Sequence, residues 1–178
     1  VIRQPFSKIN SNFTEVNNQK KLIAFLFGSR ENEIIKLNPY FKIIHDYLIN
    51  NHVDQYELFI PTLPHLKNII QKITKNWKVK VIISDDINEN ENLYKKVFVS
   101  VTCSGTASLE ISKRMIPQIV IYKLNFITFL IFSFLIKIRF ANILNILNNK
   151  MIITEVINNK LNKKNLLVAF NKLIFDQS

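Results

Sequence analysis

Glycine is nearly absent from this chain: only Gly28 and Gly105 occur among its 178 residues, where average usage of about 7% would give roughly a dozen. Each glycine follows an apolar run, residues 22–27 in one case and 97–101 in the other, and precedes a stretch that favours a helix. Both positions therefore predict a strand, a tight turn and a helix start. A glycine at such a turn lets backbone amides approach a ligand at the positive end of the helix. The two glycines predict a phosphate or nucleotide site formed by two similar turns.

Cysteine is limited to Cys103, which excludes a disulfide within the chain and is typical of a reducing compartment. We expect Cys103 to be a small buried residue at a strand end. The alternative, a catalytic thiolate, lacks a histidine near it in sequence. The Asp85-Asp86 pair is not an Asp-x-Asp metal motif and is expected in a solvated loop, so no metal and no separate cofactor are expected. The three histidines lack metal-ligand spacing and are expected at the surface: His45, His52 and His65.

Arginine is also scarce. The formal net charge of +11 comes from 24 basic and 13 acidic residues, and lysine supplies most of the basic ones. The chain shows no basic helix, no aromatic RNA-binding strand motif and no zinc-ligand spacing. A coding bias toward Lys, Ile, Asn and Phe explains the charge better than selection for a polyanion, so no nucleic-acid partner is expected. The alternative, a nucleic-acid binder, predicts strong and salt-sensitive affinity for DNA. Four of the basic residues are arginines: Arg3, Arg30, Arg114 and Arg139.

Long hydrophobic segments are few, and residues 1–6 lack the apolar region of a secretory signal. A cytoplasmic location is therefore expected. One segment, residues 124–136, requires a test for membrane contact, because it is apolar all round and runs for 13 residues between Lys123 and Lys137. A membrane-spanning helix needs about 20 residues. The segment is therefore either a buried core helix or a segment that lies at the membrane interface.

Strands and helices are expected to alternate along the domain. Residues 1–20 are polar and weakly patterned and are interpreted as a linker, which leaves residues 21–178 as the domain. After the first glycine turn, the apolar pattern predicts strands at 57–60, 78–83, 97–101 and 118–122. Helices are predicted from the Asn38-Pro39 pair onward, over 66–73, around Leu93, from Gly105 through Met115 and over 163–175, with an acidic loop at 85–91.

This alternation predicts an α/β fold, a Rossmann-like parallel sheet with helices on both faces. With 48% apolar residues, the chain is long enough to bury a real core. Ligands of such sheets bind at the carboxyl ends of the strands. Both glycine turns are predicted to lie at that edge.

Arg30 follows the first glycine turn by two residues. Its guanidinium can reach an anion that the amides of Gly28 and Ser29 already face, and a pyrophosphate fits that geometry. The alternative interpretation is a surface ion pair with Glu31 or Glu33.

Glu110 lies five residues beyond Gly105, early in the predicted helix. A carboxylate there is stabilised by the helix dipole and can accept hydrogen bonds from both hydroxyls of a ribose. The alternative interpretation is the general preference of helix starts for acidic residues.

Taken together, these motifs resemble the lipid-A-disaccharide synthases, glycosyltransferases of the GT-B fold. Residues 25–30 read Phe-Leu-Phe-Gly-Ser-Arg and are followed by Glu33-Ile34, which is similar to the family's Leu-Leu-Pro-Gly-Ser-Arg and Glu-Ile. Residues 103–110 contain Ser-Gly-Thr-Ala-Ser-Leu-Glu, similar to the family's Ser-Gly-Thr-Ala-x-Leu-Glu. Weaker similarities follow at residues 117–123, at 143–147 and at Glu155.

The resemblance covers about residues 21–175 and implies the C-terminal, nucleotide-sugar half of a GT-B enzyme. The family also has an N-terminal domain that carries the acceptor site and acidic residues implicated as the catalytic base. A separate chain that supplies this half is therefore a possible partner. Some residues depart from the family's pattern, among them Phe27 and Leu144, which replace prolines, and Asn149, which stands where a glycine is usual.

The resemblance implies transfer of 2,3-diacylglucosamine from UDP to 2,3-diacylglucosamine 1-phosphate, with release of UDP. By match, Arg30 and the turn amides of Gly28, Ser29 and Gly105 stabilise the departing diphosphate without a metal. Ser104 and Thr106 contact the phosphates or the nearby sugar, Glu110 holds the ribose, and Asn145 makes a donor-sugar or catalytic contact.

Because both substrates carry acyl chains, the resemblance also implies a role for the apolar segment 124–136 in contact with the membrane. Contact with the inner face of the inner membrane is the hypothesis, with Lys123, Lys137 and Arg139 as a basic rim. Two other functions remain open: another GT-B transferase or epimerase that uses a UDP-sugar, and a non-catalytic remnant or subunit.

Overall fold

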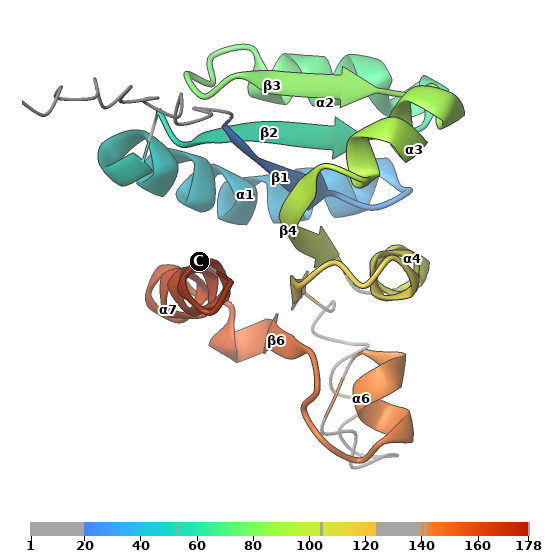
Figure 1. Cartoon of the computed structure of the whole chain (residues 1–178), viewed down its shortest axis with the longest axis vertical. Coiled ribbons are helices and arrows are strands. Elements are labelled where there is room, and N and C mark those ends of the chain that lie inside the picture. Colours follow the sequence, from blue (N-terminus) through green and yellow to red (C-terminus); the bar gives the residue numbers. More distant parts are fainter. Residues whose placement is uncertain (1–19, 53, 104, 124–139, 141, 178) are drawn as a thin grey trace, which may run out of the picture.

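The computed structural model describes residues 20–52, 54–103, 105–123, 140 and 142–177. Almost all of the predicted linker, the apolar segment 124–136 and Ser104 lie outside the described residues. The described chain forms a six-stranded parallel sheet in the order β3-β2-β1-β4-β5-β6 (Figure 1). The predicted α/β fold with a parallel sheet is confirmed. The strands are β1 (Lys21–Leu26), β2 (Tyr56–Pro61), β3 (Val81–Ser84), β4 (Val97–Cys103), β5 (Gln118–Tyr122) and β6 (Thr154–Ile157).

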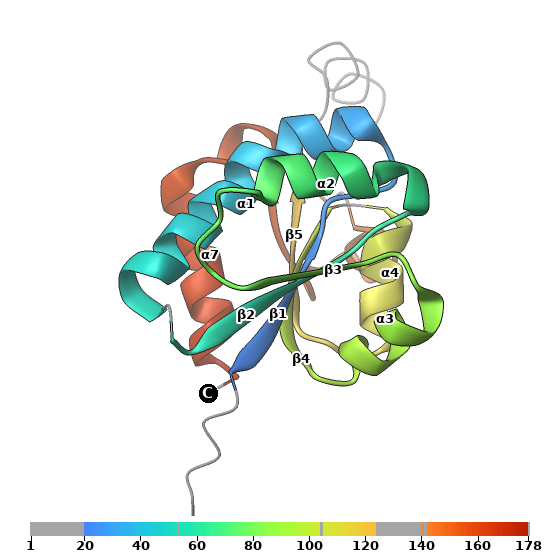
Figure 2. The same cartoon turned by 90° about the horizontal axis from the view of Figure 1, so that it is seen from above.

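Alternation along β1 directs side chains to both faces of the sheet, because successive residues of a strand point in opposite directions. On one face, Ile23, Phe25 and Phe27 join a core with apolar residues of α1 (Glu31–His52), α2 (Lys67–Thr74) and α7 (Lys163–Phe175). The opposite face packs Leu22, Ala24 and Leu26 against residues of α3 (Ile87–Tyr94) and α4 (Thr106–Lys113). The same two groups of helices lie on either side of the sheet in Figure 2. The central strands are therefore buried on both sides.

The first helix starts earlier than the sequence indicates. Instead of beginning at the Asn38-Pro39 pair, α1 begins at Glu31 and contains Pro39 within its 22 residues. The backbone N–H groups of Glu33 and Ile34 already donate to the carbonyl of Arg30. Pro39 lacks the N–H that would bond Ile35, but both side chains are exposed, so water can reach the carbonyl that is left. The glycine turn therefore leads directly into a long helix.

The prediction of an acidic loop at 85–91 is wrong, because most of this segment belongs to helix α3. The side chain of Asp86 caps this helix by accepting a hydrogen bond from the backbone N–H of Glu89, at 2.7 Å. Asp85 binds the ammonium group of Lys67 at 2.7 Å. The two aspartates are thus a helix cap and an ion-pair partner, and α3 covers the sheet.

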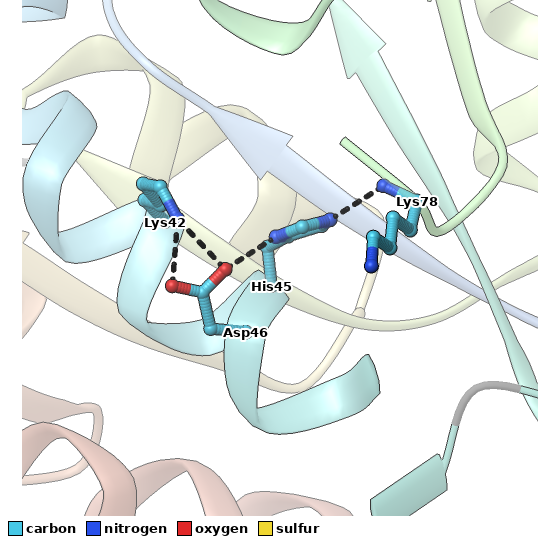
Figure 3. A network of polar contacts seen from close by, with 4 residues as sticks. All are labelled: Lys42, His45, Asp46 and Lys78. Carbon is cyan, nitrogen blue, oxygen red and sulfur yellow. Dashed lines mark hydrogen bonds and ion pairs between the residues drawn. The ribbon is translucent and has the colours of Figure 1, made fainter. Parts of the chain in front are cut away.

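His45 is buried, with 2% of its surface exposed, and not at the surface as predicted. Its ring stacks on Trp77, with ring centroids 4.6 Å apart. Its Nε2 accepts a hydrogen bond from the backbone N–H of Lys78 at 3.0 Å, and its Nδ1 lies 2.9 Å from the carboxylate of Asp46, which also binds Lys42 (Figure 3). Burial lowers the pKa of His45 below its usual value, so the ring is neutral and Nδ1 carries the proton.

The short elements near the C-terminus were not predicted. Helix α6 (Ile143–Leu147) and strand β6 are five and four residues long. The strand predicted at 118–122 and the helix predicted at 163–175 are confirmed as β5 and α7. The helix predicted from Gly105 through Met115 ends at Lys113, and Met115 has a positive φ of 57°. The sheet thus gains a sixth strand at the edge beyond β5.

Candidate functional site

A cleft of about 800 Å³ lies at the carboxyl ends of the strands. Because all six strands are parallel, this edge brings together loops that are far apart in the sequence. Gly28 and Gly105 both line the cleft, since β1 and β4 are neighbours at the centre of the sheet. Residues at the end of five strands contribute to the lining: Leu26, Pro61, Asp85, Cys103 and Tyr122.

The first glycine turn connects β1 to α1. Gly28 has a φ of 109°, a conformation that L-residues rarely adopt. A Cβ on Gly28 would lie 2.6 Å from Oε2 of Glu33 and 3.2 Å from the sulfur of Cys103. The backbone conformation therefore requires glycine at this position, and a Cβ would also displace the flexible Glu33 carboxylate and press on the sulfur of Cys103. The turn ends at the N-terminus of a 22-residue helix, where the free N–H groups favour an anion.

Arg30 lines the cleft directly after this turn, and 80% of its side chain is exposed. Its Nη1 lies 3.6 Å from Oε1 of Glu33, so the alternative ion pair anticipated from the sequence is present as well. Ser29, also exposed, lines the cleft beside it. An exposed guanidinium that pairs with Glu33 can still bind an incoming anion.

The second glycine turn connects β4 to α4. Gly105 has a φ of 118° and is the N-cap residue of α4. No described atom lies within 4 Å of the position that a Cβ would take, so here the backbone conformation alone requires glycine. Thr106 begins the helix and lines the cleft.

Cys103 ends β4 and is buried, as predicted. Burial, with the nearby charge of Glu33 as a smaller cause, raises the pKa of Cys103 to about 12. A thiolate is therefore disfavoured near neutral pH, and Cys103 contributes packing at the base of the turn.

Glu110 lines the cleft from α4, and an arginine fixes its position. The Nη2 of Arg114 lies 3.2 Å from Oε1 of Glu110. The same guanidinium binds the carboxylate of Glu91 through two hydrogen bonds of 2.7 and 2.5 Å, which hold the pKa of Glu91 below its usual range. It also lies over the ring of Tyr94, 4.4 Å from the centroid. Helices α3 and α4 are thus joined beside the cleft.

Asn145 lies outside the residues that line the cleft, and none of its surface is exposed. Its side-chain oxygen accepts hydrogen bonds from the backbone N–H groups of Ile152 and Ile153, at 2.7 and 2.8 Å. Its nitrogen donates to the carbonyl of Ile153 and to the carboxylate of Glu155. This geometry gives Asn145 a structural role in joining α6 to β6. Its donor-sugar or catalytic contact stays a prediction.

The structure therefore brings together six of the predicted site residues: Gly28, Ser29, Arg30, Gly105, Thr106 and Glu110. Sequence reasoning missed the contribution of α3, from which Asn90, Glu91 and Tyr94 also line the cleft. A signal was available, because Asp86 and Glu89 have the spacing of a helix capping box. Within the described part of the chain, no group of three or more His, Cys, Asp and Glu side chains is placed to hold a metal ion.

Comparison with known proteins matches this arrangement to one family. The family model described as lipid-A-disaccharide synthetase matches residues 3–178. The chain belongs to this family. Its members are glycosyltransferases, and the match includes most of residues 1–20, which were interpreted as a linker.

Curated relatives carry the same name. The chain is 26% identical over 155 residues to the lipid-A-disaccharide synthase of Gluconobacter oxydans, which covers 87% of this chain and 37% of that protein. It is 30% identical over 144 residues to the synthase of Rickettsia bellii, an alignment that covers 80% of this chain and 37% of that protein. It is 27% identical over 172 residues to the synthase of Acinetobacter baylyi, an alignment that covers 92% of this chain and 43% of that protein. The chain therefore spans about two fifths of the length of these relatives.

Solved structures show the same fold. A structure of MnaA with UDP from S. aureus has a TM-score of 0.57 at 19% identity, covering 94% of this chain and 40% of that one. The E. coli heptosyltransferase WaaC with ADP has a TM-score of 0.50 at 11% identity, covering 91% and 46%. These are GT-B proteins, so the chain has the fold of one half of a GT-B enzyme.

Proposed function

We propose that this chain is the donor-binding half of a lipid-A-disaccharide synthase and that its cleft holds the UDP part of an acylated UDP-glucosamine. The observation that carries this proposal is the convergence of two positive-φ glycine turns, Arg30 and Glu110 on one cleft at the carboxyl edge of the sheet. Membership of the family and the UDP-bound state of one structural neighbour support it.

In this proposal the diphosphate lies between the two turns. The backbone amides of Gly28, Ser29 and Gly105 and the guanidinium of Arg30 donate hydrogen bonds to it, with the hydroxyl group of Thr106 beside them. When the bond between the sugar and the diphosphate breaks, negative charge develops on the leaving oxygen. Donors already in place stabilise that charge without a reorganisation cost.

Glu110 accepts hydrogen bonds from the ribose hydroxyls, and Arg114 holds its carboxylate in place. No residue of the cleft is assigned as the base that takes the proton from the acceptor hydroxyl. We assign that step, and the binding of 2,3-diacylglucosamine 1-phosphate, to the part of the relatives' length that this chain does not span. That part is carried either by the same polypeptide or by a separate partner chain.

We further propose that the protein acts at the inner face of the inner membrane, from which acylated substrates are taken. None of the described helices combines the length and hydropathy needed to cross a bilayer. The support for surface contact is an apolar patch on α6 and the loop that follows it. Its five residues are between 47% and 75% exposed: Ile143, Ile146, Leu147, Met151 and Ile152.

Calorimetric titration with UDP tests the site. Arg30→Ala and Glu110→Ala should each weaken UDP binding by roughly tenfold or more, because each removes a hydrogen bond to or from a charged group. Lys36→Ala and Glu31→Ala are matched controls, since both residues are exposed on α1 and neither lines the cleft.

A folded parent protein that does not bind UDP would contradict the proposed site. So would a parent whose affinity is matched by both cleft variants. Titration with other UDP-sugars tests the second candidate, a GT-B enzyme acting on a different UDP-sugar, which the UDP-bound neighbour favours.

A further inference from the structure

Glu33 is a cleft residue whose carboxylate lies in the first glycine turn. It belongs to the first turn of α1, and its side chain is 28% exposed, whereas that of Arg30 is 80% exposed. Its Oε2 lies 2.6 Å from the position that a Cβ on Gly28 would occupy. The carboxylate therefore fills the space that the missing side chain of Gly28 leaves open. Gly28, Glu33 and Cys103 all line the cleft.

Two further observations place the negative charge of Glu33 at the junction of the two turns. One carboxylate oxygen lies 3.6 Å from Nη1 of Arg30, the cation next to the turn. The charge of Glu33 also acts on Cys103 at the end of β4: burial is the larger cause of the raised pKa of Cys103, and the nearby charge of Glu33 is the second. In the proposed function this junction is where the diphosphate binds. The carboxylate of Glu33 and the diphosphate would therefore compete for hydrogen bonds from the same guanidinium of Arg30.

We propose that Glu33 is an internal competitor of the diphosphate: it pairs with Arg30 in the empty cleft and must be displaced from it for UDP to bind. This inference rests on the proposed function. Two negative groups close together repel each other, and Arg30 cannot make its full set of hydrogen bonds to both. When UDP is the product, the return of Glu33 to Arg30 favours its release. Glu33 thus acts through Arg30: it lowers the affinity of the cleft for UDP and speeds the release of UDP.

A purely structural role for Glu33, as an acidic residue that stabilises the start of α1, makes a different prediction, and the chain provides the control. Glu31 lies in the same first turn of α1, carries the same charge and is exposed without lining the cleft. If Glu33 only stabilised the helix dipole, Glu33→Gln and Glu31→Gln would have equal effects on ligand binding.

The experiment measures binding of UDP and of inorganic pyrophosphate to the parent, Glu33→Gln and Glu31→Gln. Glutamine keeps the size and the hydrogen-bonding oxygen of glutamate, so both variants are expected to fold, which circular dichroism checks. Glu33→Gln should bind both ligands roughly three- to tenfold more tightly than the parent, as expected for removing one nearby like charge from a partly exposed site. Stopped-flow measurements should assign the gain mainly to slower dissociation. Glu31→Gln should stay within about twofold of the parent.

Pyrophosphate separates the inference from the proposed function. Tighter pyrophosphate binding by Glu33→Gln, in a protein that does not bind UDP, would support the role of Glu33 and contradict the nucleotide site. Equal affinity of Glu33→Gln and Glu31→Gln would overturn the inference, and so would a failure of all three proteins to bind pyrophosphate. In an Arg30→Ala background the gain should shrink, because the cation for which both anions compete is gone.

Discussion

At the residue scale, His45 shows how the interior sets the charge of a side chain. Both ring nitrogens have partners, and the partner of Nε2 is a backbone N–H, which requires an unprotonated nitrogen. Protonation would replace this hydrogen bond by repulsion between two N–H groups, with the ammonium group of Lys42 nearby. Its spacing from Phe41 and Leu48 along α1 places His45 on the buried face.

A pH dependence of stability follows. Because the pKa of His45 is lowered on folding from its usual 6.5, the unfolded chain binds a proton more readily. Its contribution to stability is complete above about pH 6.5 and is lost as the pH falls toward the pKa of the folded state. Urea unfolding should therefore show a lower free energy of unfolding at pH 5.5 than at pH 7.5.

The variant His45→Gln should lose most of this pH dependence and also about 1–3 kcal/mol of stability, because buried polar partners lose hydrogen bonds. His65 is exposed on the short helix after β2, so His65→Gln is the control and should behave as the parent does. A parent whose stability is equal at the two pH values would contradict the assignment.

At the scale of elements, the link between α3 and α4 sets the position of Glu110. Arg114 joins Glu91 of one helix to Glu110 of its own helix and stacks on Tyr94. Lysine cannot reproduce a guanidinium that makes three hydrogen bonds and stacks on a ring. The orientation of the proposed ribose ligand therefore depends on a residue that does not line the cleft.

Comparison of UDP with 2′-deoxy-UDP tests this link. The parent should prefer UDP, because Glu110 is proposed to accept hydrogen bonds from both ribose hydroxyls. In Arg114→Lys this preference should fall by roughly threefold or more, as expected for a weakened charge-assisted hydrogen bond, whereas Lys113→Ala should keep it. An unchanged preference in Arg114→Lys would show that Arg114 only supports the fold.

The elements also show what the sequence can predict. Apolar periodicity over five or more residues predicted β5 and α7, and the glycine turns predicted the edge of the sheet at which the cleft lies. The start of α1 was missed because an exposed proline is tolerated where water can reach the unpaired carbonyl. Strand β6 is too short for a periodic pattern, and the role of α3 in the cleft depends on packing between distant segments.

At the scale of the whole molecule, the apolar patch defined by Ile143, Ile146, Leu147, Met151 and Ile152 lies at the end of the sheet away from β3 (Figure 1). Monomeric surfaces that gather exposed apolar side chains mark sites of interaction. In the proposed function the partner is the membrane that holds the acylated substrates.

Vesicle flotation tests the patch. The parent should float with vesicles that contain anionic phospholipid, and Ile146→Asp/Leu147→Asp should reduce the bound fraction several-fold, because inserting carboxylates into an apolar interface is costly. Val168 is 63% exposed on α7, so Val168→Asp is the matched control and should float as the parent does. Equal flotation of the patch variant and the parent would exclude the patch as the contact surface.

The pairing of β1 with β4 has a consequence for how the protein acquires its site. Ala24 pairs with Ser100, and two strands, β2 and β3, and three α-helices, α1, α2 and α3, lie between these two residues in the sequence. Contacts between residues so distant in sequence close large loops and therefore form slowly. The β1–α1–β2–β3 segment alone has only one of the two turns. In the proposed function, we therefore expect ligand affinity to arise late in folding, so that nucleotide binding reports that the centre of the sheet has closed.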